Sequence, residues 1–372
     1  MHQPNLDRFR DFLRARSLSA ALLANPATIT WLTGYAPPIQ TGPSPFDGGP
    51  ALGWFCGGEL VLILSDMEAP AARATGAQVI EYAGYTVEQP LACTERQIQA
   101  LREALEPHSG LSGKAAVEWS ALPAVMLGPI QEALPRVEWQ AHDRSLDGMR
   151  AIKTADELAK IRAALRLCDL AQADVKAHLR PGVSELELWG GMKARLEIEA
   201  GGRLPLLADL AGGLRTAEIG GLPGAYTLRE GDPLIFDVVP RLDGYWGDNA
   251  ATHFAGQPPD ALVGLYGIVR DALQRGIDAV RPGARARDLD QLLRSTIRDA
   301  GYEPHPHHSG HGIGVTYHEE PRIVPYNDMP LEVGMVIAIE PGIYVPGTGG
   351  VRLEHAVLVA PGGCEVLTRH LD

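Results

Sequence analysis

Residues 237–248 read DVVPRLDGYWGD, and the folding of this stretch decides where its two end acids, Asp237 and Asp248, point. Strand-like arms flank the turn former Asp243-Gly244, so the stretch is predicted to be a β-hairpin. A loop centred between Leu242 and Asp243 would place the two acids directly opposite each other, and a loop centred on Asp243-Gly244 would make them diagonal neighbours. In both registers the acids share one face, because side chains alternate along a strand.

Two more acids lie in strand-like sequence and favour a metal site over a pair of solvated hairpin acids. Opposed strand residues have Cβ atoms about 4.5–5.5 Å apart, where two like charges are destabilising unless something neutralises them. Glu340 ends the apolar run in GMVIAIEPG, and Glu354 lies inside GGVRLEHAVLV. Buried carboxylates are costly unless they are paired or bind a metal. Two divalent ions would balance four such acids, and one imidazole would complete the ligand set.

The most specific motif of the chain is HHSGHGIGVTYHEEP, residues 307–321. With this motif, the four acids follow the order and spacing of the pita-bread metallopeptidases, the M24 family that includes methionine aminopeptidases, aminopeptidase P and prolidase. The stretches NPATITWLTGY (25–35) and MRAIKTADELAKIR (149–162) resemble the N-terminal domain and junction of the proline-specific and creatinase branch. The resemblance covers nearly the whole chain, more loosely in its first part.

The resemblance implies an α+β fold in two domains. Residues 1–146 are expected to form a small mixed α/β domain of creatinase type, and residues 147–372 a pita-bread domain with a curved antiparallel sheet flanked by helices. The change in sequence pattern near Asp147 agrees with a domain boundary there. Beyond it, Thr154 and Glu157 stand at capping-box spacing and open a long helix. From Pro233 onward the sequence predicts mainly strands, with one more helix over 260–280.

Family resemblance also implies the roles of individual residues. Asp237 would bind one metal and His311 the other, Asp248 and Glu354 would bridge them, and Glu340 would be a further ligand to the second ion. Glu340 would also act as general base toward a bridging hydroxide nucleophile. Three further residues carry expected roles: His318 would stabilise the tetrahedral intermediate, His307 would contact substrate, and Arg352 would hold a ligand carboxylate. His305 and His308 match no family role.

The implied cofactors are two divalent metal ions per subunit. The oxygen-rich ligand set suits Mn²⁺ or Co²⁺, with Zn²⁺ as a further candidate. Gly310, Gly312 and Gly314 would let the strand that carries His311 approach the ions closely.

The sequence departs from the family pattern beside the second aspartate. Residues 248–252 read DNAAT where the family usually has D-x-T-R-T, so Ala250 and Ala251 replace a threonine and an arginine. Metal binding should survive this change, but it puts substrate preference in question. Trp246 is two residues from Asp248, so a regular strand would place its indole on the metal-facing side, as one wall of a substrate cleft. An ordinary core tryptophan is the competing interpretation.

The leading function is cleavage of Xaa-Pro bonds at the N-terminus, either in dipeptides, as in prolidase, or in longer peptides, as in aminopeptidase P. One alternative is a metal-dependent hydrolase of non-proline peptides or of a small non-peptide C–N bond, similar to creatinase. A non-catalytic binding module is a third, but such relatives typically lose ligands that this chain keeps.

Composition limits the partners. The chain of 372 residues has a net charge of −13, which argues against a nucleic-acid surface. No apolar stretch of about 18 residues is present to span a membrane. We expect a cytoplasmic protein that acts on small peptides and, by family resemblance, forms a homodimer. The Pro/Gly-rich segment 36–50 is a candidate for contacting the partner subunit or covering the cleft, and a solvated loop is the alternative.

Overall fold

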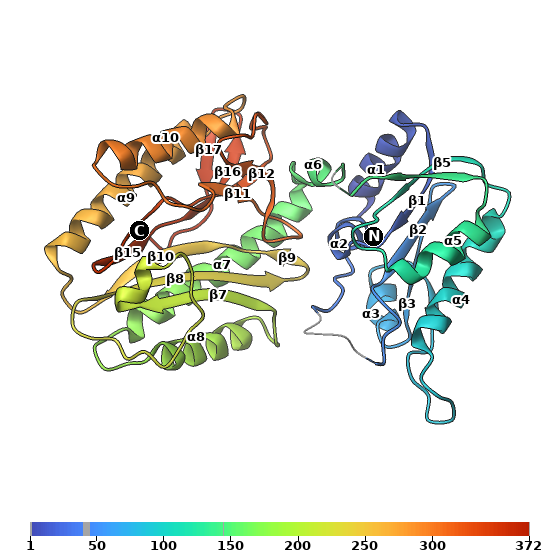
Figure 1. Ribbon diagram of the computed structural model, residues 1–372, viewed down its shortest axis with the longest axis horizontal. Helices are drawn as coiled ribbons and strands as arrows, with labels where there is room; N and C mark the ends of the chain where they lie inside the picture. The colour runs from blue at the N-terminus through green and yellow to red at the C-terminus, as the bar shows by residue number, and fades with distance from the viewer. Residues whose placement is uncertain (1, 40–44, 144, 372) are drawn as a thin grey trace. The chain divides into compact units, whose positions relative to one another are not determined.

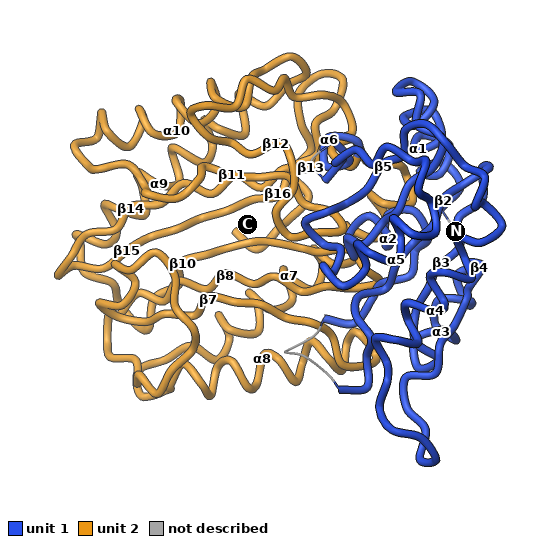
Figure 2. Tube along the Cα trace, turned by 45° about the vertical axis from the view of Figure 1, so that its right-hand side comes forward, with its two compact units in different colours: residues 1–149 blue, residues 150–372 orange. Residues whose placement is uncertain are grey.

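The structure is a computed structural model that describes residues 2–39, 45–143 and 145–371. The chain divides into two compact units, Met1–Met149 and Arg150–Asp372 (Figure 2). Five of the residues in the segment 36–50, namely 40–44, lie outside the described residues, so the predicted role of that segment as a cover or partner contact is left as a hypothesis.

In the first unit, the described residues form a mixed six-stranded sheet in the order β4-β3-β2-β1-β5-β6 (Figure 1). The central pairs β1–β2 and β2–β3 are antiparallel, and the outer pairs are parallel. This agrees with the predicted mixed α/β layer. The strands are β1 (Leu18–Leu23), β2 (Leu52–Cys56), β3 (Glu59–Ser65), β4 (Gln78–Tyr82), β5 (Gly113–Val117) and β6 (Val137–Ala141).

Helices of the first unit pack their apolar sides onto this sheet. The predicted amphipathic helix at the start of the chain is confirmed, since Leu6, Phe9, Phe12 and Leu13 are all buried in α1. The helices are α1 (Gln3–Ala15), α2 (Pro26–Thr33), α3 (Ala69–Ala74), α4 (Cys93–Leu105), α5 (Leu127–Ala133) and α6 (Asp147–Arg150), with short 3-10 helices η1 (Glu106–His108) and η2 (Ala124–Met126).

The second unit is built on two antiparallel sheets and a separate β14–β15 hairpin. Within residues 150–371, one sheet has the order β10-β8-β7 with β9 paired to β8, and the other has the order β12-β11-β13-β16-β17. The strands of the first sheet are β7 (Leu206–Gly212), β8 (Asp232–Leu242), β9 (Tyr245–Trp246) and β10 (Asn249–Ala255). The remaining strands are β11 (Gly310–Gly312), β12 (Glu319–Ile323), β13 (Val336–Ile339), β14 (Gly342–Val345), β15 (Gly349–Arg352), β16 (His355–Ala360) and β17 (Gly363–Val366).

Helices flank both sheets. Helices α7 (Ala155–His178) and α8 (Glu185–Glu199) lie along the β7–β8–β10 sheet, and α9 (Asp260–Ala279) and α10 (Ala286–Asp299) lie beside the other strands (Figure 1). A 3-10 helix, η3 (Gly213–Ala217), follows β7. The predicted capping box is present, because the Thr154 hydroxyl accepts from the Glu157 N–H and the Glu157 carboxylate accepts from the Thr154 N–H. No helix of the described chain has the length and apolar character needed to cross a membrane.

The prediction of a single helix after Pro233 was wrong, since α10 is a second one. Leu289, Leu293 and Ile297 recur every four residues along it, and all three are buried. This is the spacing of one helical face. Mostly polar residues stand between them, including Asp290 and Arg294, so no long apolar run marks the helix in the sequence. Helix α10 packs against α9 and completes the core with residues of β12 and β13.

Candidate metal centre

The turn between β8 and β9 sets the position of the two aspartates. Leu242 pairs with Tyr245, so the turn residues are Asp243 and Gly244. Both have positive φ, 49° and 84°, as a two-residue type I′ turn requires. Further along, Val238 pairs with Asn249 and Asp237 with Ala250. Asp248 is therefore two positions away from the residue across from Asp237 and lies on the same face, which confirms the diagonal register and excludes the directly opposed one.

The five predicted metal ligands line one cavity of about 620 Å³ in the second unit. His311 is the central member of the set: its Nε2 lies 3.6 Å from Asp248 Oδ2 and 3.5 Å from Glu340 Oε1. One donor atom each of Asp248, His311 and Glu354 lies within 4.8 Å of the others. The five side chains come from separate elements, with Asp237 on β8, Asp248 before β10, His311 on β11, Glu340 after β13 and Glu354 after β15.

Burial and mutual repulsion raise the pKa values of three acids of this set. Burial, together with Glu340 and Asp209, raises the pKa of Asp237 to about 6 against the opposing effect of Arg352. The pKa values of Asp248 and Glu354 are raised well above their usual range by burial and by the neighbouring carboxylates. Asp237 Oδ1, Glu340 Oε1 and Glu354 Oε1 are buried without a hydrogen-bond donor. Because a divalent cation would satisfy these oxygens and cancel the repulsion, the donor set fits metal ions.

The surroundings of His311 leave its Nε2 as the nitrogen that can bind a metal. Its Nδ1 lies 3.0 Å from the Gly312 carbonyl oxygen, and a hydrogen bond there keeps the proton on Nδ1 and the lone pair on Nε2. Burial lowers the pKa of His311 to about 4, so the imidazole is neutral. Glycine is required on both sides of it. A Cβ at Gly310 would lie 2.1 Å from the Ala338 carbonyl oxygen, and one at Gly312 would lie 2.3 Å from that of Glu320.

Glu340 is surrounded by imidazoles. His308 Nε2 lies 2.9 Å from Glu340 Oε1, without the alignment of a hydrogen bond, and His307 Nδ1 lies 3.7 Å from Oε2. Burial by itself would raise the pKa of Glu340, but contact with His308 and the proximity of His311 and His307 hold it below its usual range. Glu340 is therefore ionised, in contrast to Asp248 and Glu354, whose pKa values are raised well above their usual range.

Arg352 contacts two acids on neighbouring strands. Its Nη2 donates to Asp237 Oδ2 at 2.9 Å and to Asp209 Oδ2 at 3.1 Å. Asp209 on β7 pairs in register with Asp237, so one guanidinium lies against two like charges. The sequence analysis did not identify Asp209. An acid inside the apolar run LLADLAG is the same signal that pointed to Glu354, and it could have found this residue.

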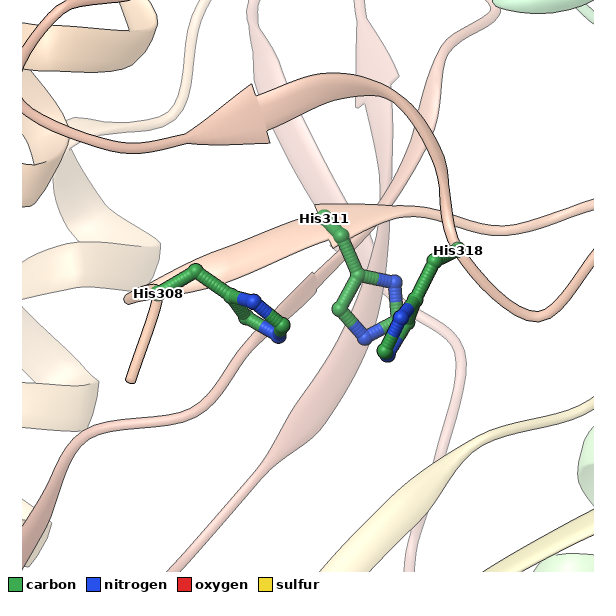
Figure 3. A group of neighbouring side chains, drawn as sticks. All are labelled: His308, His311 and His318. Atoms are coloured by element: carbon green, nitrogen blue, oxygen red, sulfur yellow. The ribbon is translucent and has the colours of Figure 1, made fainter. Parts of the chain in front are cut away.

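The four clustered histidines have different surroundings. His305 is buried with Nε2 2.8 Å from Ser309 Oγ, and His307 Nε2 lies 2.8 Å from the Tyr344 hydroxyl. Neither is among the described residues that line the cavity, whereas His311 and His318 are. His308, to which the sequence assigned no role, faces His311 and His318 (Figure 3).

Trp246, which the sequence predicted to form one wall of the cleft, packs behind Tyr317 instead. It is 5% exposed and is absent from the described residues that line the cavity. Its ring packs edge-on against Tyr317, with centroids 5.4 Å apart, and Tyr317 lines the cavity. Ala250 lies across from Asp237 on β10, so the missing threonine hydroxyl would have been next to the acid set.

The cavity lining combines acidic and apolar side chains. The acids and His311 are the first group. The apolar group is Leu186, Trp189, Leu206, Leu207, Leu222, Pro223, Val239 and Tyr317. A cavity of this size and mixed lining suits a small ligand with one polar and one apolar part.

Comparison with known proteins finds family matches in both parts of the chain. The sequence profile of metallopeptidase family M24 matches residues 159–361, more than half of the chain. The profile of the creatinase/prolidase N-terminal domain matches residues 5–152. The expected α+β fold, a creatinase-type domain followed by a pita-bread domain, is confirmed.

Individual relatives cover nearly the full length. YkvY of Bacillus subtilis is 29% identical over 368 residues, 98% of this chain and 97% of YkvY. Among solved structures, an Xaa-Pro dipeptidase from Bacillus anthracis is 26% identical with a TM-score of 0.83, and the match covers 99% of this chain and 97% of the other. A dipeptidase from Pyrococcus horikoshii is 28% identical with a TM-score of 0.82, covering 98% of each chain.

Proposed function

The chain belongs to the metallopeptidase family M24, and we propose that it cleaves the Xaa-Pro bond at the N-terminus of dipeptides or short peptides with the help of two divalent metal ions. The observation that carries this proposal is the cavity in which four acids and His311 converge, with three carboxylate oxygens lacking donors. The similarity to the Xaa-Pro dipeptidase from Bacillus anthracis supports the substrate class.

In this proposal the ligands are divided between two ions. Asp237 would hold one, His311 and Glu340 the other, and Asp248 and Glu354 would contact both. Mn²⁺ and Co²⁺ suit the predominance of oxygen donors, with Zn²⁺ as a further candidate. When bound, the ions supply polarisation of the peptide carbonyl and a water of lowered pKa.

The proton of the attacking water would go to Glu340. Support comes from its ionised state and from Oε1, which is buried and accepts no aligned hydrogen bond. His318 would donate to the oxygen that becomes negative in the tetrahedral intermediate. Burial, with His311 and His308 nearby, lowers the pKa of His318 to about 3, so its imidazole is neutral and keeps one N–H.

Two further residues would support the reaction. Arg352 is proposed as a positioning residue, because it holds one oxygen of Asp237 and leaves the other oxygen for a metal ion. His307 is proposed to contact substrate from its position 3.7 Å from Glu340.

The apolar side of the cavity supports recognition of proline. A proline ring has no N–H to satisfy and presents three methylene groups, which apolar side chains such as Val239 and Tyr317 can cover. The amine that leaves is then the ring nitrogen.

A second candidate is a dipeptidase without strict proline preference. Ala250 beside Asp237 removes a hydroxyl that the family usually has there, and the dipeptidase from Pyrococcus horikoshii is as similar as the proline-specific relative. The two candidates share the metal site and differ only in the leaving residue.

One assay separates them. Protein stripped with a chelator is tested on Ala-Pro, on a peptide with Pro in second position, and on Ala-Ala, before and after Mn²⁺, Co²⁺ or Zn²⁺ is restored. We expect metal-dependent cleavage of the proline substrates; equal cleavage of Ala-Ala would favour the second candidate. Absence of cleavage with every metal would overturn both.

Glu340→Gln tests the general base in the same assay. It should remove activity, whereas Glu332→Gln on the preceding exposed turn should not. A Glu340→Gln protein with full activity would show that the base is misassigned.

We further propose, from family resemblance, that the protein is a homodimer in the cytoplasm. Light scattering on the purified chain and fractionation of its native cells test these two points.

A further inference from the structure

Three imidazoles next to the carboxylates form a second set of metal donors. A ring nitrogen each of His308, His311 and His318 lies within 4.8 Å of the others. Figure 3 shows the three side chains next to one another. Their rings stand edge-on to one another, with centroids 4.1–5.2 Å apart. We propose that these histidines form an alternative, nitrogen-rich metal position that competes with the carboxylates for His311 and takes Cu²⁺, Ni²⁺ or Zn²⁺.

The two positions are alternatives because they share one atom. His311 also belongs to the set formed with Asp248 and Glu354. Its Nδ1 is engaged with the Gly312 carbonyl, so Nε2 is the nitrogen it can offer to either set. One lone pair binds one ion, and an ion at the histidine set therefore withdraws His311 from the carboxylate set.

His308 makes the nitrogen-rich set possible. It precedes β11 and places Nε2 2.9 Å from Glu340 Oε1, which itself lies 3.5 Å from His311 Nε2. Glu340 can thus supply one oxygen to a set that otherwise consists of nitrogens. Three imidazoles and one carboxylate make a four-donor site of the kind that holds zinc and copper in proteins.

The two sets differ in the metals they favour. Imidazole suits zinc, copper and nickel, whereas carboxylate oxygens suit manganese and magnesium. We therefore expect the position of a bound ion to depend on its identity. The functional consequence rests on the proposed function. An ion bound at the histidine set would occupy His318, which the proposed reaction uses. Such an ion would therefore inhibit peptide cleavage.

Copper spectroscopy tests the site without relying on activity. Metal-free full-length protein receives less than one Cu²⁺ per chain, and pulsed EPR counts the bound imidazoles. We expect three imidazoles in the native protein and two in His308→Asn. The affinity for Cu²⁺ should fall about tenfold or more in the variant, while the affinity for Mn²⁺ should change far less.

Two further variants complete the test. His318→Asn should also reduce the imidazole count by one, and it replaces a more exposed side chain if His308→Asn does not fold. His178→Asn, on the exposed end of α7, is the matched control and should leave the count at three. A native count of one imidazole, or a count that His308→Asn and His318→Asn leave unchanged, would overturn the proposal, whatever the outcome of the peptidase assay.

Discussion

Glu319 and three acids of the candidate metal centre are buried in the second unit, but only Glu319 has its charge balanced by two neighbouring cations. Glu319 at the start of β12 has Lys153 Nζ at 2.6 Å and Arg150 Nε at 3.5 Å, and it accepts the Thr316 N–H at 3.1 Å. Burial alone would raise its pKa, but Lys153 and Arg150 hold it below the usual range. In the metal centre, Asp248 and Glu354 are equally buried, and their pKa values are raised.

This contrast shows that burial by itself does not identify a metal site. Glu319 stabilises the fold, because the protein supplies its counter-charges and hydrogen-bond donors. The acids of the metal centre have oxygens without donors and repel one another, so the metal-free fold bears a cost that bound cations would remove. A buried acid that keeps an oxygen without a hydrogen-bond donor is the better candidate for a metal ligand, and Asp237 does so although Arg352 holds its other oxygen.

The largest effect is expected from Glu354→Gln. Loss of a shared carboxylate should lower metal-dependent peptidase activity by about a hundredfold or more and weaken metal binding. The rates and the metal content after dialysis measure both. Glu365→Gln, on the exposed surface, is the control and should keep native values. Native activity in Glu354→Gln would place the acid outside the metal centre.

Glu319→Gln should instead destabilise the protein. Removing one partner leaves Lys153 and Arg150 buried without a counter-charge, which costs about 3–5 kcal/mol. The free energy of unfolding in denaturant measures this, with attention to separate transitions of the two units. Glu365→Gln breaks the exposed pair with Arg162 and should cost at most about 1 kcal/mol. Equal losses in the two variants would contradict the comparison.

The pH dependence of stability should have opposite signs at the two groups. The pKa of Asp237 rises from 3.8 to about 6 on folding, so the folded state retains a proton that the unfolded chain releases. The contribution of Asp237 to the stability of the metal-free protein therefore falls as pH rises from about 4 to about 6. The pKa of Glu319 is lowered on folding, so its contribution is lost as pH falls below its ordinary value of 4.5.

The free energy of unfolding, measured as a function of pH over this range, gives both pH dependences. Saturating Mn²⁺ should remove the loss at higher pH, because metal binds the ionised acids. Glu354→Gln should reduce the same loss without metal, and Glu319→Gln should reduce only the loss at acid pH. A metal-free protein whose stability rises steadily with pH would contradict the assignment.

The smallest effect is expected from Trp246→Phe. Trp246 contacts Tyr317, which lies between the two groups of acids on the segment leading to Glu319. A smaller ring should let Tyr317 shift and change the relative kcat/KM values for Ala-Pro and Ala-Ala by a few-fold, with little change in metal affinity. Unchanged relative rates would leave Trp246 as a core residue with no influence on the cavity.

Sequence periodicity predicted much of this fold. The capping box of α7, the buried face of α1 and the Asp-Gly hairpin are local features, and each depends on residues within a few positions of one another. Helix α10 has an equally regular local pattern, so periodicity is sufficient to predict it. The acid inside the apolar run LLADLAG makes Asp209 predictable in the same way.

Other features could not be read from the sequence. Neighbouring histidines differ in their surroundings because residues farther along the chain contact them. Tyr344 forms a hydrogen bond with His307, and Glu340 lies next to His308. The position of Trp246 behind Tyr317 depends on how the loop before β12 packs, which strand alternation does not describe.

The order of residues is enough to place Asp237 and Asp248 on one face, because a hairpin with an even loop preserves the alternation of side chains. The order of the motifs also identifies the family. The folded unit was needed to show which buried acids lie beside a cation and which histidines surround His311. Those properties arise from contacts between residues distant in the chain, where burial and charge depend on packing of the whole unit.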